Sequence, residues 1–302
     1  MKVAVIDLGT NTCNLLIAEI EKQHFNILHQ SKQLVKLGDN KIKSNRISSA
    51  ATRRVINALL EQQKIINKFQ VEKIRLVATS AIRSAENKVE FLDEVGSRSG
   101  RLIRIVSGEK EAELIFKGVL LAFEELENPS VILDIGGGSN ELIVVHKNKM
   151  LWKESQSTGM ARVINQFSLS DPLKPDEVKK LHQFFAEKHQ AAFRQCKDKM
   201  VKTLIGCSGA FDTIADITDQ VNPGEKQRRH QEISLTDFYT LYKKITGSTH
   251  QQRLSMKGMD SVRVDLIVPA MVFIEQVIKE NNISRIIQTD FALREGVLAE
   301  MM

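Results

Sequence analysis

Two short polar segments of the chain have the composition of phosphate-binding turns. One is DLGTNT at 7–12, and the other is DIGGGSNE at 134–141. Glycine-containing turns expose successive backbone N–H groups, and these can bind phosphate oxygens. Because both turns follow an aspartate at the end of an apolar run, we favour phosphate binding over two purely structural hairpins. The candidate phosphate-binding residues are Gly9, Thr10, Asn11, Thr12, Gly136, Gly137, Gly138 and Ser139.

Carboxylates beside these turns indicate a divalent cation. Asp134 and Glu141 flank the second turn, and Asp7 precedes the first. Taken alone, Glu141 would be interpreted as a solvent-facing strand residue. Together, the three carboxylates would repel an anionic substrate unless a cation lay between them, and Mg²⁺ commonly bridges protein carboxylate and phosphate. We therefore expect Mg²⁺, with Mn²⁺ as an alternative, at Asp7, Asp134 and Glu141.

A third segment, SGEKEAE at 107–113, could supply a general base. It follows an expected strand and opens an expected helix, where acidic residues complement the helix dipole. In that position a carboxylate could also orient and deprotonate a water that attacks phosphorus. The residues alone do not choose among Glu109, Glu111 and Glu113.

Two more polar segments lie just past buried strands. ATSAIR at 78–83 places Arg83 there, and an arginine can bind phosphate through two parallel hydrogen bonds, although a surface arginine explains it equally well. Ser208 and Gly209 occupy the equivalent place in the second half of the chain. We interpret Cys207 as a small strand-end residue, since neither His nor Lys accompanies it in the chain.

The elements that carry these segments occur twice. Residues 3–17 match residues 130–144, with Asp134 lying 127 residues after Asp7. Each copy consists of an apolar run, a polar turn and a second apolar run, which is typical of two antiparallel strands. The same offset relates the expected strands at 74–79 and 201–206. Agreement at two separated places indicates a duplicated domain.

Each half is expected to form a mixed five-stranded sheet with helices on its faces, an α/β fold. Third strands are expected at 25–35 and 149–157, and the first helix at 47–66. The first half then has strand 102–106 and helix 109–126. The second has helices 234–245 and 262–280, strand 283–288 and helix 291–301. We expect domains at 1–126 and 127–290 with the site in a cleft between them, and a C-terminal helix, 291–302, that packs back on the first domain.

Composition places few limits on function. The 302 residues carry 43 Lys and Arg against 37 Asp and Glu, and an excess this small is weak support for a nucleic-acid partner. The longest apolar run, 266–274, is too short to cross a bilayer. The N-terminus lacks the apolar core of a signal peptide, and three cysteines without CxxC spacing indicate neither a zinc site nor disulfides. We expect a cytoplasmic protein with no membrane or nucleic-acid partner.

In this order, the segments resemble the exopolyphosphatase/guanosine pentaphosphate phosphohydrolase family, within the superfamily of actin, sugar kinases and heat-shock ATPases. The resemblance is carried by DLGTNT at 7–12, ATSAIR at 78–83, SGEKEA at 107–112, DIGGGSNE at 134–141, RVD at 263–265 and LREGVL at 293–298. It implies duplicated ribonuclease-H-like (actin-like ATPase) domains in a short, two-domain form.

The resemblance also implies an activity: Mg²⁺-dependent hydrolysis of terminal phosphoanhydrides in inorganic polyphosphate or guanosine pentaphosphate. It assigns the catalytic glutamate to Glu111, and the metal-site or phosphate-site carboxylates to Asp134 and Glu141. A homodimer is compatible with it.

Two other functions remain open at this stage. One is an ATP-dependent kinase of the same superfamily, although a glutamate in 107–112 favours water as the acceptor. The other is a non-catalytic sensor of polyphosphate or guanosine tetraphosphate. The sensor stays open because Ser208-Gly209-Ala210 replaces the family's usual Gly-Gly-Thr, and Glu113 stands where the family usually has arginine.

Overall fold

The computed structural model describes residues 1–22, 24–37 and 45–302. These residues form two compact units. The first contains residues 1–118 and 293–302, and the second contains residues 119–292. These limits differ by a few residues from the expected 1–126 and 127–290. Each unit is described by itself below.

The first unit is built on a five-stranded mixed sheet with the order β3-β2-β1-β4-β5. Strands β1, β2 and β3 pair antiparallel, whereas β4 and β5 run parallel to β1. The strands are β1 (Lys2–Leu8), β2 (Thr12–Glu21), β3 (His24–Leu34), β4 (Lys73–Ala78) and β5 (Arg104–Ile105). The order places β1 and β4 side by side, so the segments that follow them lie at the same end of the sheet.

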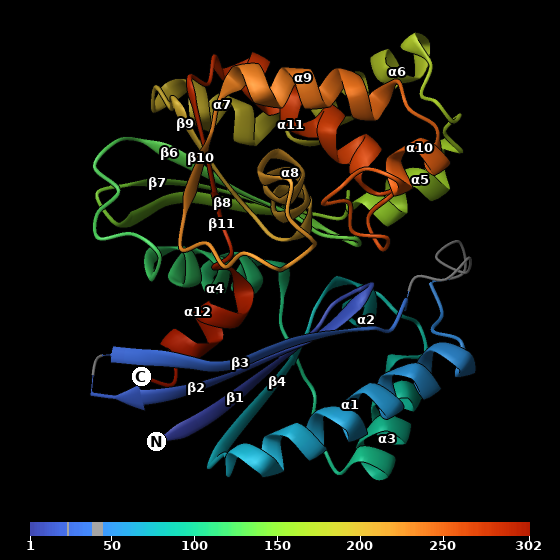
Figure 1. Ribbon diagram of the computed structural model, residues 1–302, viewed down its shortest axis with the longest axis vertical. Coiled ribbons are helices and arrows are strands. Elements are labelled where there is room, and N and C mark those ends of the chain that lie inside the picture. The colour runs from blue at the N-terminus through green and yellow to red at the C-terminus, as the bar shows by residue number, and fades with distance from the viewer. Residues whose placement is uncertain (23, 38–44) are drawn as a thin grey trace. The chain divides into compact units, whose positions relative to one another are not determined.

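Helices cover both faces of this sheet. Figure 1 shows α1 (Ser49–Phe69) and α3 (Lys88–Ser99) on one face and α12 (Leu293–Ala299) on the other, where α12 contacts β1. Ser48 begins α1 by accepting a hydrogen bond from the backbone N–H of Ala51. Buried apolar residues from the sheet, α1 and α3 form one core. Two more helices, α2 (Ser80–Arg83) and α4 (Gly108–Leu120), follow β4 and β5.

The second unit repeats this order and adds one strand at the edge. Its sheet has the order β10-β11-β9-β6-β7-β8, so β8, β7, β6, β9 and β11 correspond to β3, β2, β1, β4 and β5. The strands are β6 (Ser130–Ile135), β7 (Asn140–His146), β8 (Lys149–Gln156), β9 (Thr203–Cys207), β10 (Gln231–Ile233) and β11 (Arg285–Thr289). The expected five strands are therefore corrected to six here. Strand β10 has three residues, too few to show an alternating pattern, and only its antiparallel pairing with β11 defines it.

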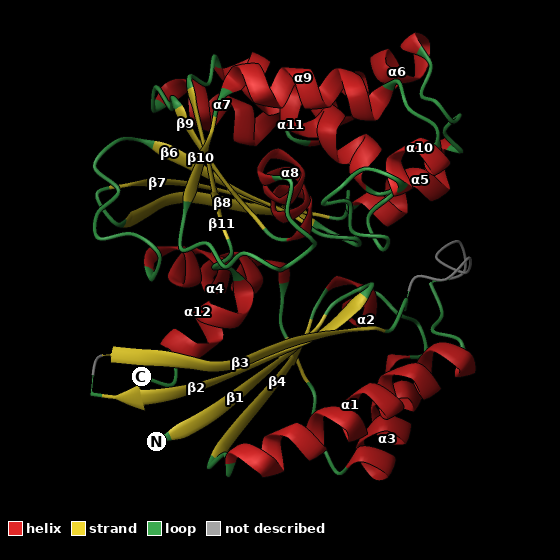
Figure 2. Ribbon diagram, in the orientation of Figure 1, coloured by secondary structure: helices red, strands yellow, loops and turns green. Residues whose placement is uncertain are grey.

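The helices of the second unit form a large layer, visible in Figure 2, and their buried apolar residues belong to one core. At its centre lies α11 (Ile267–Asn281), which contacts α5, α6, α7, α8 and α9. Within this layer the rings of Phe185 and Phe273 stack, with their centroids 4.4 Å apart. The other helices are α5 (Met160–Phe167), α6 (Pro175–Lys188), α7 (Gln190–Asp198), α8 (Gly209–Asp219), α9 (Leu235–Thr246) and α10 (His250–Leu254).

Two helix boundaries differ from the expected ones. Helix α4 ends at Leu120 rather than 126, because the backbone N–H groups of Ala122 and Phe123 bond three residues back and the last turn tightens. Helix α11 begins at Ile267 rather than 262, which places Pro269 in its first turn, where the missing N–H costs nothing. Apolar spacing continues past both ends, so it could not locate them.

The expected fold class, two mixed α/β sheets of the actin-like kind, is confirmed by the shared strand order. Across 1–22, 24–37 and 45–302, no helix has the length and apolarity needed to cross a membrane. The cleft expected between the halves stays a prediction.

Candidate functional site

In the second unit, the carboxyl ends of the parallel strands β6 and β9 bring several predicted residues together. Asp134 lies opposite Cys207 on β9 and opposite Glu141 on β7. The Ser208 hydroxyl, one residue beyond β9, donates to Asp134 Oδ2 at 2.6 Å. Ligands of such sheets bind beyond the carboxyl ends of the parallel strands. This end of the sheet is therefore the candidate site.

The glycine turn between β6 and β7 is held by its carbonyl oxygens. Those of Gly136 and Gly137 each accept from a backbone N–H at 3.0 Å, donated by Met160 and Ala161, and that of Gly138 accepts from Arg162 Nε at 2.9 Å. In a planar trans peptide the C=O and the following N–H point in opposite directions. The N–H groups of 137–139 are therefore directed away from α5, as a phosphate-binding turn requires.

Residues 159–162, here called the clamp segment, approach this turn at contact distance. A Cβ atom on Gly159 would lie 2.4 Å from the backbone of Gly137 and Gly138. Only glycine allows so close an approach. The N–H groups that begin α5 are used on the turn, so this helix end is a structural support and is not itself free to bind an anion.

Ser208 adopts φ 67° and ψ 176°, a region occupied almost only by glycine. Its side chain does not cap α8 and instead reaches Asp134. The serine therefore combines an unfavourable backbone conformation with a hydrogen bond to the carboxylate. The next residue, Gly209, begins α8, whose N-terminal N–H groups favour a negative ligand.

An arginine that the sequence analysis did not assign lies at this helix end. A Cβ atom on Gly209 would fall 2.0 Å from Arg263 Nη2, so the guanidinium lies directly over the start of α8. Arg263 is partly exposed. A guanidinium beside a helix N-terminus suits a phosphate. Arg263 belongs to the RVD segment at 263–265, which is one of the segments that carry the family resemblance. Its spacing in the sequence, however, could not predict that this segment lies beside Gly209.

The arrangement of the two carboxylates in this unit bears on the expected Mg²⁺ site. Asp134 and Glu141 are directly opposed on neighbouring strands, so they project from the same face with Cβ atoms about 5 Å apart. Both are buried, and Ser155 Oγ donates to Glu141 Oε1 at 2.6 Å. Among the described residues no group of three or more His, Cys, Asp or Glu could hold a metal. Two carboxylates suit Mg²⁺ when phosphate oxygens and waters supply the remaining ligands.

Cys207 is excluded as a nucleophile by its surroundings. The thiol is fully buried beside Asp134, and burial together with that carboxylate raises its pKa well above the usual value. A thiol that stays protonated is unreactive.

In the first unit, Asp7 occupies the position that Asp134 has in the second. It pairs with Asn14 across β1 and β2, and Asn14 Nδ2 donates to Asp7 Oδ2 at 3.1 Å. Burial raises the pKa of Asp7 to about 6, although the hydrogen bond from Asn14 opposes that shift. Its Oδ1 is buried and has no hydrogen-bond partner among the residues that the structure describes. Such an atom needs a partner such as a water or cation, which fits the expected ligand role.

The first turn is held in the same manner as the second. The Gly9 N–H donates to the Thr12 carbonyl at 2.9 Å and closes the turn. The carbonyls of Thr10 and Asn11 accept from backbone N–H groups at 35–37, just after β3. Both copies therefore fix their turn by its carbonyl oxygens, with a segment that follows the third strand.

Among the three glutamates of the third segment, Glu111 is set apart by burial. It is 7 % exposed, whereas Glu109 is exposed and Glu113 is partly exposed beside Lys110. Arg83, at the end of α2, donates through Nη1 to Glu111 Oε2 at 2.8 Å and to the Val106 carbonyl at 2.9 Å. The structure thus joins two predicted site residues, the buried Glu111 and the partly exposed Arg83, in one ion pair.

Residues 16–302 match the model of the Ppx/GppA phosphatase family. The chain belongs to the Ppx/GppA phosphatase family. The expected enzyme class, a phosphoanhydride hydrolase, agrees with that membership.

Individual Ppx/GppA relatives match over nearly the full chain. A crystal structure of an exopolyphosphatase from Cytophaga hutchinsonii is 34% identical, covers 100% of this chain and 97% of its own, and superposes with a TM-score of 0.94. An Aquifex aeolicus family member is 25% identical over 100% of this chain and 97% of its own, with a TM-score of 0.83. Exopolyphosphatase 2 of Mycobacterium tuberculosis is 27% identical over 92% of this chain and 90% of its own.

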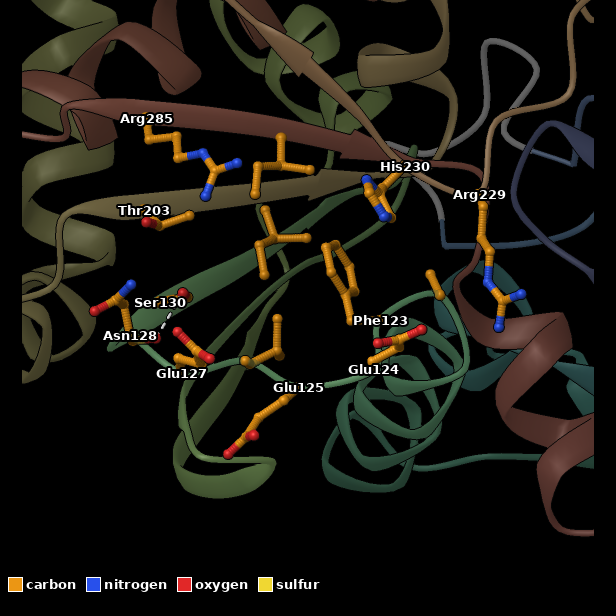
Figure 3. Close-up of a pocket in the computed structure, with 14 residues that line it drawn as sticks. Phe123, Glu124, Glu125, Glu127, Asn128, Ser130, Thr203, Arg229, His230 and Arg285 are labelled. Atoms are coloured by element: carbon orange, nitrogen blue, oxygen red, sulfur yellow. Dashed lines mark hydrogen bonds between the residues drawn. The ribbon is translucent and has the colours of Figure 1, made fainter.

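One cavity of this Ppx/GppA protein lies elsewhere in the second unit. It has a volume of about 460 Å³ and is formed at the amino ends of β6, β9 and β11, where Ser130, Thr203 and Arg285 line it (Figure 3). None of the predicted site residues lines it. Arg285 pairs with Glu232, and the His230 ring stacks on Phe123 at 4.9 Å. The cavity is therefore not part of the candidate site.

Proposed function

We propose that this protein releases terminal orthophosphate from inorganic polyphosphate, guanosine pentaphosphate or both, with Glu111 as the general base. The observation that carries the proposal is the pairing of Arg83 with the buried Glu111 at the start of α4. The guanidinium fixes one carboxylate oxygen, and a fixed carboxylate is suited to orient a water and accept its proton. A non-catalytic sensor requires no such base, and a kinase would need a base that activates its phosphoryl acceptor instead of a water.

Substrate binding is assigned to the two turns and to the basic residues near them. The turns at 9–12 and 136–139 each have carbonyls fixed by a later segment, which supports binding of phosphate oxygens by their N–H groups. Arg83, Ser208 and Gly209 are proposed as further phosphate contacts, with Arg263 added from its position over α8. The exopolyphosphatase names of the relatives support polyphosphate as the substrate class.

Mg²⁺ is proposed as the cofactor, with Mn²⁺ as an alternative. Asp134 and Glu141 would hold it, and Asp7 is the third proposed ligand. When bound, the ion would neutralise phosphate charge and polarise the phosphoryl oxygens. In the protein itself, Ser208 and Ser155 orient the two carboxylates through their hydroxyl groups. A cytoplasmic location and homodimerisation stay predictions.

The proposal is tested by measuring orthophosphate release from polyphosphate, guanosine pentaphosphate and ATP. Glu111→Gln keeps the shape and the hydrogen bond from Arg83 but cannot accept a proton, so we expect kcat to fall by about 10² to 10⁴ with KM little changed. Glu109→Gln, exposed in the same turn, is the matched control and should retain wild-type turnover.

The same assay tests the metal. Activity should disappear in excess chelator, and Asp134→Ala and Glu141→Ala should raise the Mg²⁺ concentration needed for half-maximal rate. Full activity in chelator would refute the metal assignment. Retained turnover in Glu111→Gln would refute the base.

A further inference from the structure

A chain of four polar side chains runs through the interior of the second unit, next to the glycine turn. Asn140 Nδ2 donates to Thr158 Oγ1 at 3.1 Å, Thr158 Oγ1 lies 3.0 Å from His189 Nε2, and His189 Nδ1 lies 2.6 Å from Glu154 Oε1. Asn140 and His189 are fully buried, and Thr158 is 3 % exposed. A buried polar network whose members are hydrogen-bonded to one another makes the segments that carry them rigid.

The directions of these bonds form one consistent series. Since the Asn140 amide donates to the Thr158 oxygen, the threonine hydroxyl hydrogen is available to His189 Nε2. His189 Nδ1 carries a proton and donates it to Glu154 Oε1 at 2.6 Å, because a carboxylate oxygen can only accept. The Phe273 ring, stacked on His189 at 4.6 Å, fixes the plane of the imidazole. His189 is thereby held in one orientation between Glu154 and Thr158.

One end of this series adjoins the glycine turn, and its second member adjoins the clamp segment. Asn140 directly follows Ser139, and its amide also donates to the Thr158 carbonyl at 2.8 Å. Thr158 directly precedes the clamp segment, residues 159–162, which holds the carbonyls of the three turn glycines. The position of Thr158 therefore sets the position of the clamp segment against the turn.

We propose that Glu154, His189 and Thr158 are positioning residues that hold the clamp segment so that the N–H groups of the 136–139 turn point toward bound phosphate. The inference rests on the proposed function, because it assumes that this turn binds the substrate. The hydrogen bonds described above join the three side chains to one another and to Asn140, so each acts on the turn through the clamp segment.

The test uses Thr158→Val, which keeps the volume of the side chain and removes the hydroxyl. The variant loses the hydrogen bond between Thr158 and His189 Nε2, so the clamp segment is held less firmly against the turn. We therefore expect the turn to bind phosphate less well. We expect KM for polyphosphate and the inhibition constant of orthophosphate to rise about tenfold while kcat stays within about twofold, because a turn that binds substrate and transition state equally affects KM alone.

Two further variants make the outcome decisive. Thr158→Ser restores the hydroxyl and should return KM to within about twofold of wild type. Thr52→Val removes an equally buried hydroxyl, bonded to the Ser48 carbonyl in the first unit, and should leave KM and kcat unchanged. Its thermal midpoint reports the purely structural cost of such a change.

Arg162→Lys provides a second test that does not depend on a buried substitution, so it keeps the proposal testable if Thr158→Val fails to fold. It retains the charge but lacks the Nε that donates to Gly138, and it should raise KM in the same direction. An active wild type whose KM is unchanged in Thr158→Val and Arg162→Lys would overturn this inference while leaving the proposed function intact. A wild type that releases no orthophosphate would instead overturn the proposed function.

Discussion

At the scale of single residues, Ser208 combines an unfavourable backbone with a favourable side-chain contact. Its φ of 67° with ψ near 176° costs about 1–3 kcal/mol for a residue other than glycine. The hydrogen bond from the Ser208 hydroxyl to Asp134 at 2.6 Å offsets part of this strain and orients the carboxylate. Local strain of this kind is found mainly where function requires a particular geometry.

Replacing Ser208 separates the two contributions. Ser208→Ala removes the hydroxyl and keeps the strain, whereas Ser208→Gly removes both. We expect the glycine variant to be more stable than the alanine variant by about 1–2 kcal/mol, as strain relief exceeds the entropy that glycine adds to the unfolded chain. Urea unfolding of both proteins measures the difference. Equal stabilities would show that the backbone at 208 is not strained.

Among the structural elements, α12 shows how the end of the chain completes the first unit. It contacts β1, and a Cβ atom on Gly296 would lie 1.7 Å from the Leu114 carbonyl on α4. Lys110 and Lys117 of α4 both donate to Glu300, one residue beyond α12. A close backbone approach and a shared carboxylate therefore fix α12 against α4.

Substitution of Gly296 tests this packing. Gly296→Ala must push α12 away from α4, and we expect a loss of about 1–3 kcal/mol in the free energy of unfolding. Gly96→Ala is the control, because Gly96 lies inside α3 and its added Cβ would meet nothing closer than the Arg101 carbonyl at 3.7 Å. There alanine should stabilise the protein by about 0.5–1 kcal/mol. Similar effects at both positions would contradict the proposed close packing.

The element scale also shows what sequence could predict. The repeated strand–turn–strand pattern correctly predicted β1, β2, β6 and β7, because alternation and turn chemistry are local properties. It could not predict β10, which exists only through pairing with β11. The clamp segment was missed for the same reason. Gly159 carries no local turn signal, and its role depends on contact with Gly137, which is distant in the sequence.

The site shows the same division between local and tertiary information. The sequence alone left Glu109, Glu111 and Glu113 as alternatives, and the resemblance selected Glu111. The structure distinguishes Glu111 by burial and by its pairing with Arg83, a contact across 28 positions of the chain. Arg263 could be assigned to the site only from its tertiary contact with the start of α8, which the sequence does not show.

At the scale of the whole molecule, charge pairs determine how stability depends on pH. Partial burial of Glu300 disfavours ionisation, but hydrogen bonds from Lys110 and Lys117 outweigh it and lower the pKa of Glu300 to about 2. In the second unit, the hydrogen bonds of Lys226, Arg228 and Gln231 likewise overcome burial and lower the pKa of Asp219 to about 2. Each unit thus contains a carboxylate that is stabilised in its ionised form.

These shifts predict acid sensitivity with a defined range. Above pH about 4.5 both carboxylates are ionised in the folded and unfolded states, so their stabilisation is complete. As pH falls from about 4.5 to 2, the unfolded state binds protons first and the stabilisation is lost. The raised pKa of Asp7 acts in the opposite sense, lowering stability as pH rises from about 4 to 6. Below pH about 4, loss of the Glu300 and Asp219 pairs should therefore dominate.

Glu300→Gln and Asp219→Asn test this prediction in separate units. Each should lower the free energy of unfolding by about 1–2 kcal/mol at pH 7, and the difference from wild type should vanish as pH approaches 2, because protonation has the same effect as the amide. Urea midpoints measured from pH 7 to 2.5 give the comparison. Glu61→Gln, in an exposed pair with Lys64, should change stability by less than about 0.5 kcal/mol at any pH. A difference that persists unchanged at low pH would show that these carboxylates act through packing and not through their charge.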